Sequence, residues 1–140
     1  MAGDTVERTL VLVKPDAFAR KLTGEIIARL ERKGLALLAL ERMTVNRRLA
    51  ERLYGEHAGK PFFEGLVSFI TSGPLVAMVL EGEQAVQAAR QVMGATDSLQ
   101  ASPGSIRGDF ATAVRQNLVH GSDSVQSAAR ETGLFFSELD

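Results

Sequence analysis

The chain has 140 residues, of which 45% are hydrophobic and 24% charged, and its formal net charge is −1. This length predicts one domain over residues 1–140, and the composition is typical of a folded globular protein. A net charge near zero provides no overall field toward nucleic acid or an anionic membrane, so an anion site must be a local cluster of basic residues. The absence of cysteine excludes disulfides, thiolate metal sites and thiol nucleophiles.

The N-terminal segment MAGDTVERT lacks the layout of a secretory signal, and no apolar run reaches membrane-spanning length. We therefore expect a cytoplasmic protein. No internal repeat, low-complexity tract or linker divides the sequence.

The chain begins with a predicted strand followed by a helix. Residues 8–14, RTLVLVK, are short and apolar, as expected of a buried strand that Pro15 stops. Thr23 is the expected N-cap of the helix, and Gly34 is expected to end it. The helix has its apolar residues on one face, namely Ile26, Ile27 and Leu30.

The middle of the chain predicts a second strand and two more helices. Residues 35–45, LALLALERMTV, follow a helix stop and favour a strand. Asn46 is the expected N-cap of a polar helix that runs through Tyr54. Pro61 is a candidate start for the next helix, which has apolar residues at helical spacing: Phe62, Phe63, Leu66, Phe69 and Ile70.

The last third predicts a strand at 74–81, a helix at 83–93 that ends before Gly94, and a long loop at 95–109. A short strand near Leu118 and Val119 precedes a helix from Ser124 to Glu131. This order predicts an α+β or split-βαβ fold with helices packed on one face of a small sheet.

His120 is one of two histidines and lies in the stretch NLVHGSD. A lone histidine is usually a surface or structural residue, but this one has an unusual setting. A neutral imidazole is a competent nucleophile or base at pH 7, and the adjacent glycine lets the backbone turn and leaves the ring accessible. Ser122, Asp123 and Glu131 are candidates to orient the ring or to bind a cation nearby.

Several familiar sites are excluded by spacing. His120, Ser122 and Asp123 are too close in sequence to converge as a hydrolase triad, and no G-x-S-x-G turn is present. The zinc spacing H-E-x-x-H is absent. The stretch GEHAGKP at 55–61 has one residue too few between its glycines for a phosphate-binding P-loop, and Pro61 replaces the Ser or Thr that would hold magnesium. The RGD tripeptide at 107–109 has the sequence of an adhesion motif, but in a chain expected to be cytoplasmic that match is interpreted as incidental.

Three basic residues are candidates for an anion pocket. Lys14 ends an apolar strand just before a proline, Arg107 follows a glycine-containing loop, and Arg90 lies near the end of a helix. With the hydroxyls of Thr96 and Tyr54 they would suit phosphoryl chemistry, which depends mainly on positioning and electrostatic stabilisation.

These stretches together resemble the nucleoside diphosphate kinase family. NLVHGSD is similar to the active-site motif N-x-x-H-G-S-D of that family. Further similar blocks occur in the family's order across nearly the whole chain: ERTLVLVKPDA, GEIIARLERKG, KPFFEGLVSFITSGPLVAMVLEG, MGATD, PGSIRGDFA and HGSDSVQSAARETGLFF.

The resemblance implies a ferredoxin-like βαββαβ fold with a four-stranded antiparallel sheet, in a hexamer or tetramer. It implies ping-pong transfer of the γ-phosphate of a nucleoside triphosphate, typically ATP, to a nucleoside diphosphate. His120 would take the phosphate, so that covalent catalysis splits the transfer into two steps. Mg²⁺ would be held mainly by the nucleotide phosphates and water, with Asp123 nearby.

The resemblance also implies roles for the other site residues. Ser122 and Glu131 match the pair that orients the imidazole. Phe62 and Val114 match the two sides of a base slot, whose aromatic and aliphatic walls suit broad base specificity; taken alone, both residues would be interpreted as core. The residues that match the phosphate contacts are Lys14, Tyr54, Arg90, Thr96 and Arg107, and those that match the sugar-hydroxyl contacts are Lys14 and Asn117.

Three departures from the family pattern bear on local structure and assembly. Ala17 replaces the glycine that usually follows K-P-D, Ser98 stands where many relatives have proline, and the C-terminal stretch is shorter than in many relatives. Two alternatives to an active kinase are a ferredoxin-like RNA-binding module and a catalytically inactive interaction protein. The near-zero charge and the lack of an aromatic RNA-binding strand argue against the first, and the complete set of matched residues argues against the second.

Overall fold

A computed structural model of the chain describes residues 6–139. Its centre is a four-stranded antiparallel sheet in the order β2-β3-β1-β4, which confirms the predicted α+β fold. The strands are β1 (Val6–Val13), β2 (Ala36–Met43), β3 (Leu75–Glu83) and β4 (Val119–Gly121). The helices are α1 (Pro15–Ala19), α2 (Thr23–Arg32), α3 (Arg47–Leu53), α4 (Phe63–Ile70), α5 (Ala85–Met93), α6 (Ile106–Phe110) and α7 (Val125–Phe135), with a 3₁₀ helix at Gly55–His57.

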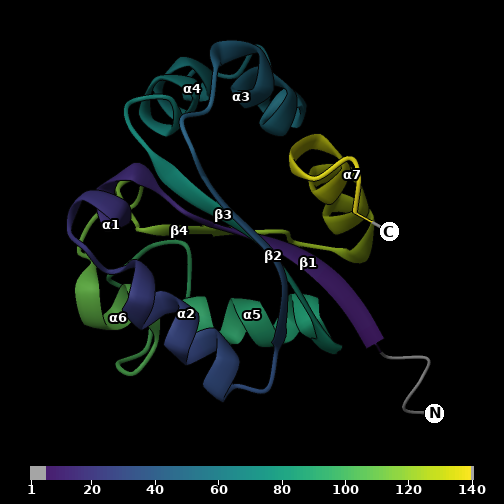
Figure 1. Cartoon of the computed structure of the whole chain (residues 1–140). Coiled ribbons are helices and arrows are strands. Elements are labelled where there is room, and N and C mark those ends of the chain that lie inside the picture. The colour runs from purple at the N-terminus through teal and green to yellow at the C-terminus, as the bar shows by residue number, and fades with distance from the viewer. Residues whose placement is uncertain (1–5, 140) are drawn as a thin grey trace.

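Helices cover both faces of the sheet (Figure 1), so the prediction of helices on one face is wrong. Val11 and Val13 of β1 point into the core cluster that includes residues of α2 and α5. Leu10 and Leu12 point into a second cluster, with residues of α3, α4 and α7. The four consecutive residues have no exposed surface, because a strand between two helical layers buries its side chains on both sides.

The predicted helices are present, with shifted ends. Asn46 and Ser124 are N-caps whose side chains accept backbone N–H groups. Thr23 is the first residue of α2 instead of its cap, and its hydroxyl has no hydrogen-bond partner within residues 6–139. The helix predicted from Pro61 begins at Phe63, and β3 runs through Glu83, so that α5 starts at Ala85.

Two short α-helices, α1 and α6, were not predicted. Pro15 stops β1 but also begins α1, since a proline at the first helical position lacks only an N–H that would be unpaired there. In α1, Ala17 is fully buried and packs in the core. Ser105 caps α6 by accepting the N–H of Gly108, so the segment 95–109 is not loop throughout.

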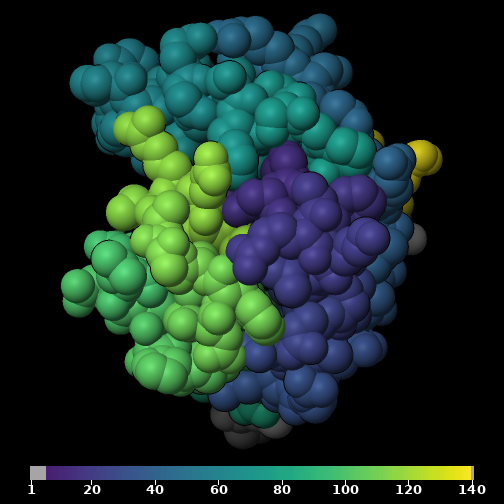
Figure 2. All heavy atoms as spheres, turned by 90° about the vertical axis from the view of Figure 1, so that its left-hand side faces the viewer, coloured from purple at the N-terminus to yellow at the C-terminus, as the bar shows by residue number. Residues whose placement is uncertain are grey.

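Segments distant in sequence meet on one face of the molecule. Figure 2 shows the purple to indigo surface of α1 and α2 beside the green to yellow-green surface between α5 and β4, with the blue to teal surface of α3 and α4 above. Hydrogen bonds from the Lys14 N–H to the carbonyl of Leu118, and from Arg20 to the carbonyl of Phe110, join the two segments. Within residues 6–139, no helix is long and apolar enough to cross a membrane.

Candidate active site

A pocket of about 490 Å³ gathers the residues that the sequence analysis singled out. Its size is that of a site for a small organic ligand. The strand ends and loops around it come from both halves of the chain. Every predicted site residue except Ser122 lines it: Lys14, Tyr54, Phe62, Arg90, Thr96, Arg107, Val114, Asn117, His120, Asp123 and Glu131.

His120 is held in place by Glu131. The His120 Nε2 lies 2.9 Å from Oε1 of Glu131, and the hydroxyl of Ser122 donates to the same oxygen at 2.8 Å. Ser122 is buried behind the pocket wall, and the ring of Tyr54 stands edge-on to the imidazole with 6.3 Å between centroids. This arrangement fixes the orientation of the imidazole.

The charge of Glu131 fixes which ring nitrogen is protonated. Burial alone would raise the pKa of Glu131, but its hydrogen bond to His120, the charge of His120 and the Ser122 hydroxyl outweigh that effect and lower the pKa. The resulting carboxylate can only accept a hydrogen bond. It therefore favours the tautomer with hydrogen on Nε2, which leaves the lone pair of a neutral imidazole on Nδ1.

Lys14 is a buried cation in the pocket wall. Its Nζ donates to Oδ1 of Asn117 at 2.6 Å and to the carbonyl of Arg115 at 3.1 Å. Burial is the main reason that its pKa falls to about 8; Asp16 raises the pKa and the positive charge of Arg107 lowers it. The side chain is therefore mostly protonated at neutral pH, with little water to compete for its charge.

Asn117 links three parts of the wall. While its oxygen accepts from Lys14, its amide nitrogen donates to the carbonyls of Thr96 and Val114. The buried side chain thereby joins the segment after α5 to the segment before β4. Only the family resemblance pointed to Asn117, and the three hydrogen bonds by which it joins these segments are visible only in the structure.

Arg107 is the second buried cation. Its guanidinium donates to the carbonyls of Gly94, Asn117 and Val119, at 2.9, 3.2 and 2.6 Å. Burial and the nearby charge of Arg90 lower its pKa to about 10, so it stays charged at neutral pH. A cation fixed by three backbone groups is preorganised to meet negative charge without moving.

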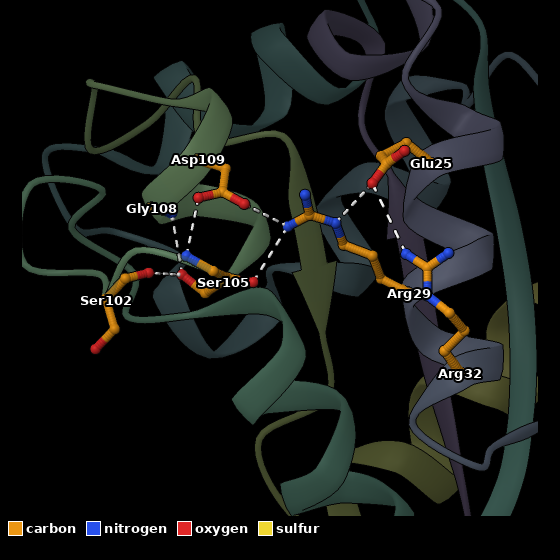
Figure 3. A network of polar contacts seen from close by, with 8 residues as sticks. Glu25, Arg29, Arg32, Ser102, Ser105, Gly108 and Asp109 are labelled. Atoms are coloured by element: carbon orange, nitrogen blue, oxygen red, sulfur yellow. Dashed lines mark hydrogen bonds and ion pairs between the residues drawn. The ribbon is translucent and has the colours of Figure 1, made fainter.

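A polar network anchors the helix that carries Arg107 (Figure 3). Arg29 of α2 contacts Asp109 of α6 at 2.8 Å and Glu25 at 2.8 Å, and its guanidinium lies 4.9 Å from the centroid of the Phe110 ring. Asp109 also accepts the N–H of Gly104. Within the RGD tripeptide, Arg107 lines the pocket and Asp109 ties α6 to α2.

Phe62 and Val114 line the outer part of the pocket, where Val114 is 55% exposed. An exposed valine on a pocket wall is not a core residue. The apolar side chain of Val114 alone would have placed it in the core, whereas the family resemblance placed it at the site. Ser98 is buried and donates its hydroxyl to the carbonyl of Ala113 at 2.6 Å. This bond braces the segment that carries Val114, at a position where many relatives would have proline.

Asp123 lines the pocket near Arg90. A hydrogen bond from Ser127 is the largest cause that lowers its pKa, and the charge of Arg90 also contributes. Within residues 6–139, no group of three or more His, Asp or Glu side chains can hold a metal ion. One ionised carboxylate fits Mg²⁺, which is commonly bound by one or two carboxylates together with phosphates and water.

Comparison with known proteins identifies the family. The family model described as nucleoside diphosphate kinase matches residues 7–140. A nucleoside diphosphate kinase from Frankia casuarinae is 63% identical over 96% of this chain and 98% of its own length. The chain belongs to the nucleoside diphosphate kinase family. It is accordingly an enzyme, a phosphotransferase, which argues against the RNA-binding and inactive alternatives.

Other members of the family agree in sequence and structure. A nucleoside diphosphate kinase from Carboxydothermus hydrogenoformans is 57% identical over 95% of this chain and 89% of its own length. The solved structure of a halophilic nucleoside diphosphate kinase from Halobacterium salinarum in complex with CDP matches with a TM-score of 0.92 and 50% identity. That match covers 96% of this chain and 91% of the other.

Sequence reasoning missed several residues of the pocket wall. Leu66 lines it one helical turn after Phe62, a spacing that was visible in the sequence but was interpreted as core. His57 also lines the pocket, and its ring is tilted against that of Phe62 with 5.2 Å between centroids. Arg115 adds a cation beside Val114. No pattern pointed to His57, which ends the short 3₁₀ helix, or to Arg115, which stands in an irregular segment.

Proposed function

We propose that the chain transfers the γ-phosphate of a nucleoside triphosphate, typically ATP, to a nucleoside diphosphate through a phosphohistidine on His120. The observation that carries this proposal is the contact between Nε2 of His120 and Glu131, which keeps a lone pair on Nδ1 in a pocket with several cations. A histidine used only as a structural residue needs no such cations around it.

The two half-reactions follow from this tautomer. Nδ1 attacks the γ-phosphorus, the bond from that phosphorus to the β,γ-bridging oxygen breaks, and the nucleoside diphosphate leaves. A terminal oxygen on the β-phosphate of the second nucleotide then attacks the phosphohistidine, and the nitrogen–phosphorus bond breaks. The ring gains positive charge while Nδ1 is bonded to phosphorus, and the carboxylate of Glu131 offsets that charge.

The basic side chains are proposed to hold the phosphates. Lys14 and Arg107 are buried and preorganised, and Arg90 completes the cationic wall. Burial is the main cause that raises the pKa of Tyr54, so this residue offers a neutral phenol as a donor beside the hydroxyl of Thr96. Loss of one oriented contact should cost about 2–4 kcal/mol in the transition state, by analogy with oxyanion-hole donors.

Phe62 and Val114 are proposed to hold the base from its two sides. A ring face and an aliphatic wall contact any base without reading its edge, which supports broad base specificity. Lys14 and Asn117 are proposed to contact the sugar hydroxyls. The Halobacterium relative, solved with CDP, supports binding of nucleoside diphosphates by this chain.

Mg²⁺ is the proposed cofactor, held by the nucleotide phosphates and water with Asp123 alongside. Bound there, the ion would neutralise phosphate charge and orient the phosphate chain. Asp123 would supply one carboxylate toward its water shell. The side chain is exposed and ionised, as this role requires.

The deciding experiment is to trap the phosphoenzyme. The protein is mixed with γ-labelled ATP and Mg²⁺ and quenched in denaturant, and His120→Ala is treated in the same way. We expect acid-labile, base-stable label on the native protein and none on the variant, and GDP added before the quench should convert the label into GTP. GTP formation without trapped label, or label on His120→Ala, would exclude the phosphohistidine route.

We also propose that the chain forms a homo-oligomer, a hexamer or tetramer, through the outer edge of β2. This strand is at the edge of the sheet and exposes Leu37, Leu38 and Leu40, a combination that favours pairing with a second copy. Leu40→Lys should reduce the assembly in analytical ultracentrifugation, whereas Val125→Lys on α7 should not. A cytoplasmic location remains a prediction from the sequence.

A further inference from the structure

A strained turn lies directly before the strand that carries His120. The backbone N–H of Val119 donates to the carbonyl of Asn117 at 2.9 Å, an i to i+2 bond that closes a γ-turn around Leu118. Leu118 has φ of +79°, the rare and strained form of this turn. It is neither glycine nor asparagine, the residues that tolerate such a conformation, so its surroundings must impose it.

We propose that Asp16 is a positioning residue for phosphoryl transfer, because it holds the γ-turn at Leu118 that sets the place of His120. Its Oδ2 accepts the backbone N–H of Leu118 at 3.1 Å. Leu118 is fully buried, so without Asp16 this N–H would lose its partner where water does not replace it. The inference rests on the proposed role of His120 as the phosphorylated residue.

The turn at Leu118 is held by hydrogen bonds to one short segment of the chain, residues 14–16. Lys14 donates its backbone N–H to the carbonyl of Leu118 at 2.9 Å, and Asp16, two residues later, accepts the N–H of that same residue. Pro15 between them fixes the start of α1. Both polar backbone groups of Leu118 are therefore bound by residues on either side of one proline.

The turn has a direct effect on His120 because β4 is short. The strand has three residues, each paired with β1, and His120 is opposite Leu12. With so few pairs, the path by which the chain enters β4 determines where the imidazole sits. A displacement of about 1 Å at a reacting group can slow a reaction about 100-fold, so a relaxed turn would misplace Nδ1 even if nucleotide still bound.

An electrostatic role for Asp16 is the competing explanation, since its charge also acts on Lys14. The variant Asp16→Asn distinguishes the positioning role from the electrostatic role, because it removes the charge and keeps an acceptor. Its amide oxygen can still accept the Leu118 N–H, and the new nitrogen replaces Oδ1, which has no partner within residues 6–139. Asp16→Glu does the opposite: it keeps the charge but displaces the carboxylate by one methylene.

The test measures the single-turnover rate of His120 phosphorylation against ATP concentration, with Mg²⁺ present. We expect Asp16→Ala and Asp16→Glu to lower the rate at saturating ATP roughly tenfold or more, with apparent ATP affinity unchanged within about threefold. Asp16→Asn should stay close to the native protein. Glu7→Ala is the matched control, because it removes a carboxylate that accepts a backbone N–H, that of Val86, away from the pocket.

The outcomes distinguish the two proposals. If the native protein forms no phosphohistidine, the proposed function fails before the variants are compared. If the native protein is labelled but Asp16→Asn is as slow as Asp16→Ala, while Asp16→Glu is fast, charge on Lys14 explains the effect and the positioning role is overturned. Equal rates in the native protein and Asp16→Ala would overturn it too. Asp16→Asn and Asp16→Glu keep the test decisive if Asp16→Ala unfolds.

Discussion

Glu131 binds His120 through the same oxygen that accepts the hydroxyl of Ser122. That oxygen lies 2.9 Å from the histidine nitrogen and 2.8 Å from the serine oxygen. The second carboxylate oxygen lies 3.6 Å from the guanidinium of Arg130. The imidazole is therefore oriented by a charged group that is itself held from two sides.

Glu131→Gln tests the charge of this group. The amide keeps the size of the side chain and can still bond to His120, but it does not offset the positive charge that the ring gains on phosphorylation. We expect phosphohistidine formation to slow by roughly 10- to 100-fold, measured by rapid quench with labelled ATP. Glu138→Gln, on an exposed residue after α7, is the control. An unchanged rate in Glu131→Gln would show that its charge is dispensable.

The lowered pKa of Lys14 predicts a limit on activity at alkaline pH. The free enzyme should lose the Lys14 proton above pH 8, the pKa that burial gives it, and with it a cation that attracts phosphate. We expect kcat/KM to fall above that pH, while kcat stays level to higher pH because bound phosphate raises the pKa. The measurement is the pH profile of both constants.

The free energy of unfolding should rise with pH over the alkaline range in which kcat/KM falls. An unfolded Lys14 holds its proton up to its ordinary pKa of 10.5, whereas the folded one loses it near 8. Because the unfolded state then binds more protons, this group raises the free energy of unfolding between those two pH values. In Lys14→Gln both pH effects should be absent; a native profile of kcat/KM that is flat to pH 9.5 would contradict the assignment.

Gly108→Ala should disturb Arg107 through its helix. A Cβ at this position would collide with the carbonyl oxygen of Ser102 and lie 2.9 Å from Oγ of Ser105. We expect a loss of about 1–3 kcal/mol in the free energy of unfolding, measured in urea, together with slower phosphoryl transfer. Gly133→Ala is the matched control at an exposed position of α7, where nothing lies within 4 Å.

Helix propensity alone should make the Gly133→Ala control more stable by about 0.5–1 kcal/mol. Equal effects of the two substitutions would mean that the close approach at Gly108 does not constrain α6.

The order of the strands and main helices could be predicted from the sequence because apolar periodicity and caps such as Asn46 act locally. The second helical layer was also accessible: Leu10 to Val13 are apolar without alternation, which indicates a strand buried on both faces. Likewise, Ser105 was a recognisable N-cap for α6. Both signals were present and were interpreted too narrowly.

Other parts of the site could not be predicted from local pattern. The positive φ of Leu118 is imposed by partners about a hundred residues away, and leucine has no propensity for it. The hydrogen bond of Lys14 to Asn117 likewise joins opposite ends of the chain. Only the family resemblance placed Lys14 and Asn117 in one site, because convergence is a property of the tertiary fold.

The pocket wall extends from Lys14 to Glu131 in the sequence and includes residues from the strands, helices and loops between them. A nucleotide seated there would touch segments that separate whenever any large part of the chain opens. Any partly unfolded form in which one of these segments has opened would therefore lose the binding energy of the nucleotide. Cellular nucleotide would thus act as a folding ligand, protecting the whole chain against proteolysis in proportion to how far the pocket is filled.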